Sequence, residues 1–239
     1  MRASPPPCSP MLNNYSATVG NTMPDVNPQP RREYHSPKRE QRALATRRRI
    51  RLAAERLFLR DGYLPTTMTK IAAEAGVAEK TVYLAFPTKA DLLTEIIRIG
   101  VRGDEDSTRL SQRAEWGEMR ASRSVDRLLD QAAARNAALM ARAARFLALG
   151  EASAAIDPQL AELRDRGHRN IRSDMRELAT ALAAIDPRID PERLAETLFA
   201  FAANESPYLR LSEECNWPQQ QYAAALRAIL AALVDHATS

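Results

Sequence analysis

The stretch "AEAGVAEKTVYLAFPTKADLL", residues 73–93, interrupts a helical pattern with a single glycine and resumes it at once. Two short helices that cross at a wide angle need a small residue in the first helix, a residue tolerant of positive φ in the turn, and an apolar residue in the second. Ala72, Gly76 and Val82 supply these in order. Pro87 then ends the second helix, because proline cannot continue the hydrogen-bond ladder. The stretch therefore predicts a helix-turn-helix.

An amphipathic helix precedes this motif. From Ile50 to Phe58, apolar residues recur at the spacing of one helix face that packs on a core, and the pattern ends at Gly62. Thr66 and Thr67 then offer hydroxyl groups that cap the first helix of the motif. The motif is thus expected to pack against a longer helix that begins at about residue 40.

The rest of the chain also has a helical pattern. Thr88 is placed to cap a fourth helix, and three Asp-Pro pairs after residue 150 provide capping carboxylates with proline at the first helical position. Glycine is scarce, at 8 residues, and aromatic residues make up only 5%. We therefore predict an all-α protein with later helices at about 122–136, 138–154, 157–184, 190–211 and 218–236.

The basic charge is concentrated towards the N-terminus. Residues 1–100 hold 16 basic and 9 acidic residues, whereas residues 101–239 hold 18 basic and 21 acidic residues. A field of positive sign attracts a polyanion. The alternative is a solvated basic tail and helix face.

Three regions are expected along the chain. Residues 1–38 are rich in Pro, Ser and Asn without an apolar period, and we interpret them as a disordered arm. Residues 39–103 are expected to form the domain that contains the helix-turn-helix, at about 67–86, and residues 104–239 a second helical domain.

Several functional classes lack their usual sequence signals. No apolar run reaches the length of a membrane span, and the N-terminus has no secretory pattern, so a cytoplasmic protein is expected. The two cysteines are far apart, and no Cys/His spacing suits a metal, so neither a disulfide nor a metal or other cofactor is predicted. The three histidines are also distant in sequence, and no nucleophile–base pair or phosphate-binding loop is recognisable. An enzyme is therefore not expected.

The segments "TRRRIRLAAERLFLRDGY" (46–63) and "TTMTKIAAEAGVAEKTVYLAFPTKADLL" (66–93) resemble the TetR family of bacterial transcriptional regulators, of the TetR/AcrR type. The resemblance covers about residues 44–104. It implies a three-helix helix-turn-helix domain that binds DNA, followed by a helical domain for effector binding and dimerisation. Family members often carry Ser or Thr where Ala78 stands, and a His-aromatic pair where Leu84 and Ala85 stand. These departures concern the base contacts and not the fold.

The resemblance also implies roles for residues of the motif. The third helix would enter the major groove with its N-terminal residues at base edges; these residues are Ala78, Glu79, Lys80, Thr81 and Leu84. Positions that hold phosphates in the family correspond to Thr66, Thr67, Tyr83 and Lys89. Three alternatives stay open: Glu79 only favours the helix N-terminus by its charge, Thr67 is only a cap, and Tyr83 is mostly core.

The basic arm has a second interpretation beside that of a solvated tail. A flexible Arg-rich segment before the first helix can follow a neighbouring minor groove or phosphate backbone and add salt-sensitive affinity. The candidate contacts are Arg31, Arg32, Lys38 and Arg39.

The last two predicted helices carry more apolar residues than one buried stripe needs, which resembles the family's four-helix dimer interface. The candidate interface residues are Leu194, Leu198, Phe201, Tyr222, Leu226, Ile229, Leu230 and Leu233; the alternative is that they pack within one subunit. The resemblance further implies an effector pocket in this domain, for which the candidates are Met140, Phe146, Met175 and Phe199. Such residues at helical spacing are alternatively core.

The favoured function is a homodimeric repressor that binds a roughly palindromic operator in double-stranded DNA and is released by an unknown small-molecule effector. One alternative is an architectural or partner-binding DNA protein without a ligand response. A remote alternative is an enzyme with an unrecognised site.

Overall fold

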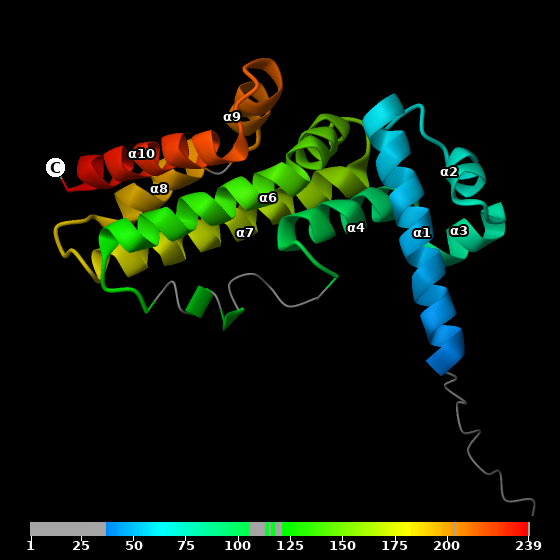
Figure 1. The fold of residues 1–239 in the computed structure, drawn as a ribbon, viewed down its shortest axis with the longest axis horizontal. Coiled ribbons are helices and arrows are strands. Elements are labelled where there is room, and N and C mark those ends of the chain that lie inside the picture. The colour runs from blue at the N-terminus through cyan, green and yellow to red at the C-terminus, as the bar shows by residue number, and fades with distance from the viewer. Residues whose placement is uncertain (1–36, 106–112, 115, 118–120, 203, 239) are drawn as a thin grey trace, which may run out of the picture.

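The computed structural model describes residues 37–105, 113, 114, 116, 117, 121–202 and 204–238. Within these ranges the ordered elements are helical and none is a strand, which confirms the predicted all-α class. Figure 1 shows the helices α1 to α3 at one end of an elongated molecule and the remaining helices at the other. We call the first group the head and the second, which starts with α4, the body.

The head consists of three helices. They are α1 (Pro37–Asp61), α2 (Met68–Ala75) and α3 (Glu79–Ala85). The buried stripe of α1 runs from Ile50 to Phe58 as the apolar spacing predicts, and it shares one core cluster with α2, α3 and α4.

The first helix of the motif ends at Gly76, as the sequence predicts. Gly76 caps α2 in the left-handed region, with φ 63 and ψ 42, and its N–H group bonds carbonyl groups of Ala72 and Ala73. A side chain rarely adopts this conformation, so glycine is required there for the backbone and not for space. Val82 is fully buried and packs α3 against α1 and α2 in the same core cluster.

Helix α4 (Lys89–Arg102) connects the head to the body. It begins with a capping box in which Thr88 and Asp91 satisfy each other's backbone N–H groups. Its other end packs closely on α6: a Cβ atom on Gly150 would lie 2.9 Å from Ile97 Cδ1, and one on Gly100 would lie 3.2 Å from Ala143 Cβ. Small residues therefore let α4 approach α6.

The body is built around a second core cluster. Its main helices are α6 (Val125–Ser153), α7 (Pro158–Ala183), α8 (Pro191–Ala202) and α10 (Gln219–Ala237), and the short α9 (Ser206–Leu209) continues into η2 (Arg210–Glu214), a π-helical turn. Of the described helices, none combines the length and the apolar character that a bilayer crossing requires.

Two sequence-based helix assignments and one capping prediction were wrong. The helices expected at 122–136 and 138–154 are one continuous α6, because no glycine or proline interrupts the chain at that point. The helix expected at 190–211 ends at Ala202. Asp157 and Asp190 bond backbone N–H groups at helix starts as predicted, whereas Asp186 bonds Arg188 in a turn before α8.

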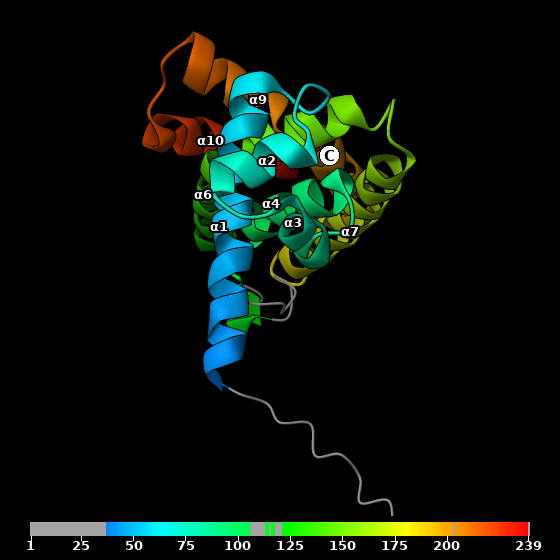
Figure 2. The same cartoon turned by 90° about the vertical axis from the view of Figure 1, so that its right-hand side faces the viewer.

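Helix α1 also begins earlier than expected. It starts at Pro37, so Lys38 and Arg39 lie on a helix and not in a flexible arm. Arg31 and Arg32, the other two candidate arm contacts, lie outside the described residues. Figures 1 and 2 show that the N-terminal part of α1 extends well beyond the other helices of the head.

Candidate nucleic-acid interface

Helix α3 presents an exposed face on a buried anchor. Val82 is fully buried and Phe86 is 1% exposed, whereas Tyr83 is 48% and Leu84 79% exposed. Ala78, Glu79 and Lys80 are exposed as well, and Thr81 is half-buried. Most of the side chains predicted for base contact are therefore exposed to solvent on α3, a helix at the end of the molecule that faces the viewer in Figure 2.

The start of α3 has no side-chain cap. Ala78 occupies the N-cap position in an extended conformation and makes no side-chain bond, as its missing hydroxyl requires. Glu79 is the acidic residue of the first turn. This position supports the interpretation that its charge favours the N-terminus of the helix.

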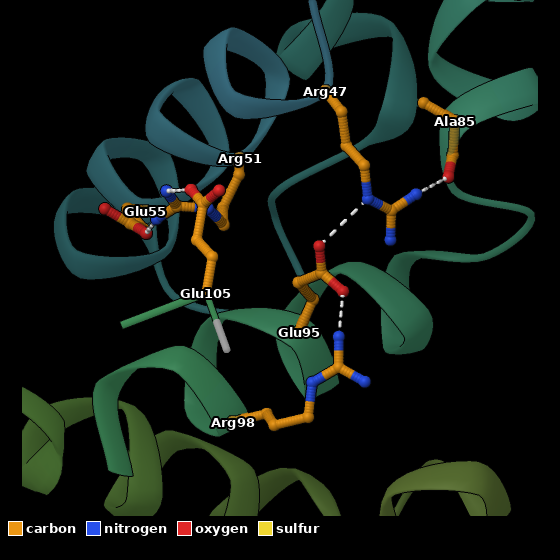
Figure 3. A network of polar contacts seen from close by, with 7 residues as sticks. All are labelled: Arg47, Arg51, Glu55, Ala85, Glu95, Arg98 and Glu105. Atoms are coloured by element: carbon orange, nitrogen blue, oxygen red, sulfur yellow. Dashed lines mark hydrogen bonds and ion pairs between the residues drawn. The ribbon is translucent and has the colours of Figure 1, made fainter. Parts of the chain in front are cut away.

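The end of α3 is held by Arg47, as Figure 3 shows. The guanidinium group donates to the backbone carbonyl of Ala85 and, at 2.9 Å, to Glu95 on α4. Its central carbon also lies 3.9 Å from the ring centroid of Phe86. One side chain of α1 therefore joins α3 to α4 by charge, hydrogen bonds and cation–π contact.

Glu95 is the acidic centre of this network. Burial alone would raise its pKa, but the hydrogen bond from Arg47 and the charges of Arg47, Arg98 and Arg51 outweigh burial and keep the pKa of Glu95 below its ordinary value. Nearby, Arg51 pairs with Glu55 within α1 at 2.6 Å and with Glu105, just after the end of α4, at 3.0 Å, and the second pair ties α1 to this end of α4.

Sequence reasoning missed the role of Arg47, which it counted only as part of a basic run. The spacing to Glu95 is 48 residues, so no local pattern joins the two side chains. The available signal was chemical: an Arg beside a buried helix end, with a carboxylate on the facing helix, favours an ion pair.

The two threonines before α2 differ in position. Thr66 is fully buried and its hydroxyl donates to the carbonyl of Gly62 at 2.7 Å, so the prediction that it contacts phosphate is wrong. The buried hydroxyl instead closes the turn after α1. Thr67 is exposed and accepts from the N–H of Lys70 at 3.2 Å, as an N-cap does.

Lys89 is engaged within the protein. Its ammonium group donates to the carbonyl of Tyr63 at 2.7 Å and to that of Leu64 at 3.4 Å, and it lies 4.1 Å from the ring centroid of Tyr63. Burial lowers the pKa of Lys89. The side chain therefore links the start of α4 to the turn between α1 and α2.

The same turn contacts the body. The hydroxyl of Tyr63 donates to Asp157, the N-cap of α7, at 2.6 Å. Burial, followed by the hydrogen bond and negative charge of Asp157, raises the pKa of Tyr63. Gln159 of α7 also bonds Asp91 and Thr88 at the start of α4. The head is thus fastened to the beginning of α7.

Most of the predicted dimer residues are buried within the chain. Five of them are at most 5% exposed and belong to the core of the body, so their assignment to a dimer interface is wrong; they are Leu194, Leu198, Tyr222, Leu226 and Leu230. The physical reason is that α8 and α10 use these faces to pack on α6, α7 and each other. Phe201 and Ile229 remain 64% and 48% exposed, and Leu233 is half-buried.

The four candidate pocket residues do not form one cluster. Phe146 packs on the first core cluster and Met175 on the second. Met140 is buried on α6, and Phe199 lies under the guanidinium group of Arg172, which is 4.5 Å from the ring centroid. Two surface hollows, of about 350 and 310 Å³, are lined by residues 121–124 with 127 and by residues around Arg47, and neither includes these four.

The described residues contain no group of three or more His, Cys, Asp or Glu side chains that could hold a metal ion. Cys215 is an exposed free thiol.

Comparison with known proteins agrees with this geometry. Residues 50–96 match the family described as bacterial regulatory proteins, tetR family. The transcriptional repressor BepR of Brucella suis is 44% identical over 55 residues, which are 23% of this chain and 26% of BepR, so the chain spans about a quarter of the length of this curated relative.

Solved structures are similar over most of the chain. NalD, the secondary repressor of the MexAB-OprM multidrug efflux pump in Pseudomonas aeruginosa, aligns with a TM-score of 0.60 and 23% identity over 81% of this chain and 98% of NalD. A regulator from Saccharomonospora viridis in complex with choline aligns with a TM-score of 0.56 and 19% identity over 81% of this chain and 97% of its own. At these identities the alignments show a shared fold. Residues 50–96 are thus similar in sequence to the tetR family of bacterial regulatory proteins, and the chain as a whole shares the fold of the aligned structures.

Proposed function

We propose that this protein is a homodimeric transcriptional repressor that binds a roughly palindromic operator through α3 and is released by a small-molecule effector. The observation that carries the proposal is the exposed face of α3, whose polar and apolar side chains project from a helix anchored by Val82, Phe86 and Arg47. A short helix supported in this way can enter a major groove without losing its own packing.

The residue roles follow from exposure and chemistry. Lys80 is an exposed donor suited to guanine acceptors, and Leu84 offers an apolar contact to a thymine methyl group. We expect Thr67, Tyr83 and Lys89 to contact phosphates, and such contacts set the register of α3 on the duplex.

Dimerisation would place two copies of α3 on one face of the double helix. Half-sites about one turn apart, ~34–36 Å, match a two-fold protein. The exposed apolar residues Phe201 on α8 and Ile229 on α10 favour a contact between copies through these helices.

An effector would act on the body. The contact of Tyr63 with Asp157 joins the head to α7, and the contact of Asp91 with Gln159 joins α4 to α7, so a ligand that shifts α7 would change the position of α3. The choline complex of the S. viridis regulator supports a small-molecule ligand for this fold but does not identify the effector of this chain.

The decisive experiment is selection of bound fragments from genomic DNA, followed by anisotropy titration of the selected duplex. We expect tight, salt-sensitive binding of two subunits and much weaker binding to a scrambled duplex. Equal affinity for the scrambled duplex would instead support the architectural alternative. A repressor with an effector also predicts that compounds related to the products of the neighbouring genes reduce operator affinity.

A further inference from the structure

Helix α1 continues past the head as a basic, unsupported extension. Arg47 contacts the carbonyl of Ala85, so the end of α3 lies level with this residue of α1. From there α1 runs back to Pro37, a further ten residues or about 15 Å at 1.5 Å per residue. Figure 2 views the molecule from the end that carries α3 and shows the extension running alongside and beyond it.

The charge of the extension is strongly one-sided. Residues 37–49 contain six basic residues and a single acidic one, Glu40. Lys38, Arg39, Arg42, Arg48 and Arg49 are exposed, and none of their five side chains makes a hydrogen bond or ion pair with another described residue. Like charges three and four residues apart, as in Arg39 with Arg42 and Lys38 with Arg42, destabilise a helix. A polyanion along the helix would relieve this repulsion.

Helical spacing divides these residues between two faces. Arg42 precedes the buried Ala53 by eleven residues, about three turns, and Arg39 precedes the buried Leu57 by eighteen, about five turns. Both arginines therefore continue the face of α1 that packs on α2 and α3. Arg48 precedes Leu57 by nine residues, about two and a half turns, and so lies on the opposite face.

We propose, resting on the DNA-binding function above, that the N-terminal extension of α1 binds the phosphate backbone of the DNA that flanks each half-site, through Arg39 and Arg42. The extension is continuous with the α3 surface and its sign is opposite to that of DNA. Phosphates follow one another closely along a duplex, so a helix of this length meets several of them. These contacts add affinity and lengthen the protected site without reading sequence.

The test compares single variants of the full chain on DNA that the wild-type protein has selected. Arg42→Ala and Arg39→Ala should each weaken binding about three- to tenfold near 0.1 M salt. Each removes one phosphate contact per subunit, so the slope of log K against log salt should fall by about 1.8 for the dimer. Arg48→Ala is the matched control, because it removes the same charge from the same exposed helix and should change affinity less than about twofold. Alanine favours the helix, so loss of helix does not explain a loss of binding; circular dichroism checks this point.

A second comparison uses a duplex trimmed to the two half-sites. On this duplex Arg42→Ala and wild type should bind alike, and hydroxyl-radical protection of the flanks should be lost with Arg42→Ala on the long duplex. Equal effects of Arg42→Ala and Arg48→Ala would overturn the inference, as would an Arg42→Ala loss that persists on the trimmed duplex. Tight binding by wild-type protein in either case leaves the proposed function standing, whereas failure of wild type to select any sequence refutes that function itself.

Discussion

Arg47 shows how one side chain sets the position of a whole helix. It satisfies the carbonyl of Ala85 at the end of α3, covers the ring of Phe86 and pairs with Glu95 of α4. Lysine lacks the planar fork that makes these contacts together. The direction of α3 therefore depends on an arginine that belongs to a different helix.

Replacing Arg47 with alanine should lower the free energy of unfolding by about 1–3 kcal/mol, because charged hydrogen bonds and a cation–π contact are lost together. Operator affinity should fall as well, since α3 loses its anchor. Arg47→Lys should recover only part of both, and Arg48→Ala should leave stability nearly unchanged. Urea denaturation measures the stabilities, and full recovery by lysine would show that charge alone suffices.

The network also predicts a dependence on pH. Glu95 has a pKa below its ordinary value of 4.5, so its ion pair with Arg47 contributes stability above that value and loses it as pH falls through the lower, folded-state pKa. Glu95→Gln should therefore be less stable than wild type at pH 7, and the difference should shrink below about pH 4. Thermal unfolding from pH 3 to pH 7 provides the measurement; a difference that does not vary with pH would contradict this assignment.

Two lysines near α3 should behave differently in DNA binding. Lys80 is exposed on α3, and Lys80→Ala is expected to change the preference between bases at one operator position by about 1–3 kcal/mol. Lys89→Ala should weaken binding to all sequences about equally, because its expected contact is to phosphate. Competition binding against a panel of single-base variants separates the two outcomes. Matching profiles for both variants would show that the division of roles is wrong.

At the scale of elements, the angle between α2 and α3 depends on the backbone of Gly76. A Cβ atom at this position would meet nothing within 4 Å, so space is not the constraint. The constraint is φ 63, which costs a non-glycine residue about 1–2 kcal/mol. A methyl group at residue 76 would therefore fit without a clash, but the backbone of an alanine there would be strained by the positive φ.

Gly167 offers a matched control for this argument. It too would have nothing within 4 Å of a Cβ atom, but it lies inside α7 with an ordinary helical φ. Gly76→Ala should lower stability by about 1–2 kcal/mol, whereas Gly167→Ala should raise it by up to about 1 kcal/mol. Thermal or urea unfolding of the two variants tests the opposite signs, and destabilisation of similar size at both sites would refute the backbone explanation.

At the scale of the whole molecule, the body uses most of its apolar surface internally. Leu198 and Leu230 are buried between the helices of the body, while Phe201 and Ile229 project outward from the same two helices. The burial of large apolar side chains favours association at about 25 cal/mol per Å² removed from water. A contact between two copies is therefore expected at the outward residues and not at the buried ones.

Phe201→Glu combined with Ile229→Glu should shift the protein from dimer to monomer and weaken operator binding more than tenfold, because two linked heads bind far more tightly than one. Leu64→Glu is the control for assembly alone, since Leu64 is 67% exposed but lies in the turn between α1 and α2, away from α8 and α10. Sedimentation velocity measures the assembly. A dimer that survives the double substitution would locate the interface elsewhere.

Local features of the chain were sufficient to predict the helical class and the helix-turn-helix. Gly76, Pro87 and the capping residues Thr67 and Thr88 act through backbone geometry over a few residues, so their effects are legible in the sequence alone. The continuous α6 was missed because periodicity alone leaves helix boundaries uncertain. The start of α1 did have a local signal, since proline is favoured at the first helical position and Pro37 occupies it, but this signal was not used.

Only the tertiary structure decided which side chains are available to partners. Thr66 is next to the exposed Thr67 in sequence, and Leu226 lies on the same helix as the exposed Ile229. Packing nevertheless buries Thr66 and Leu226 and leaves Phe201 and Ile229 exposed. The bond from Arg47 to Glu95 likewise joins residues 48 positions apart. Sequence determines local backbone preference because that preference acts over neighbouring residues, whereas burial and pairing depend on the elements that meet in space.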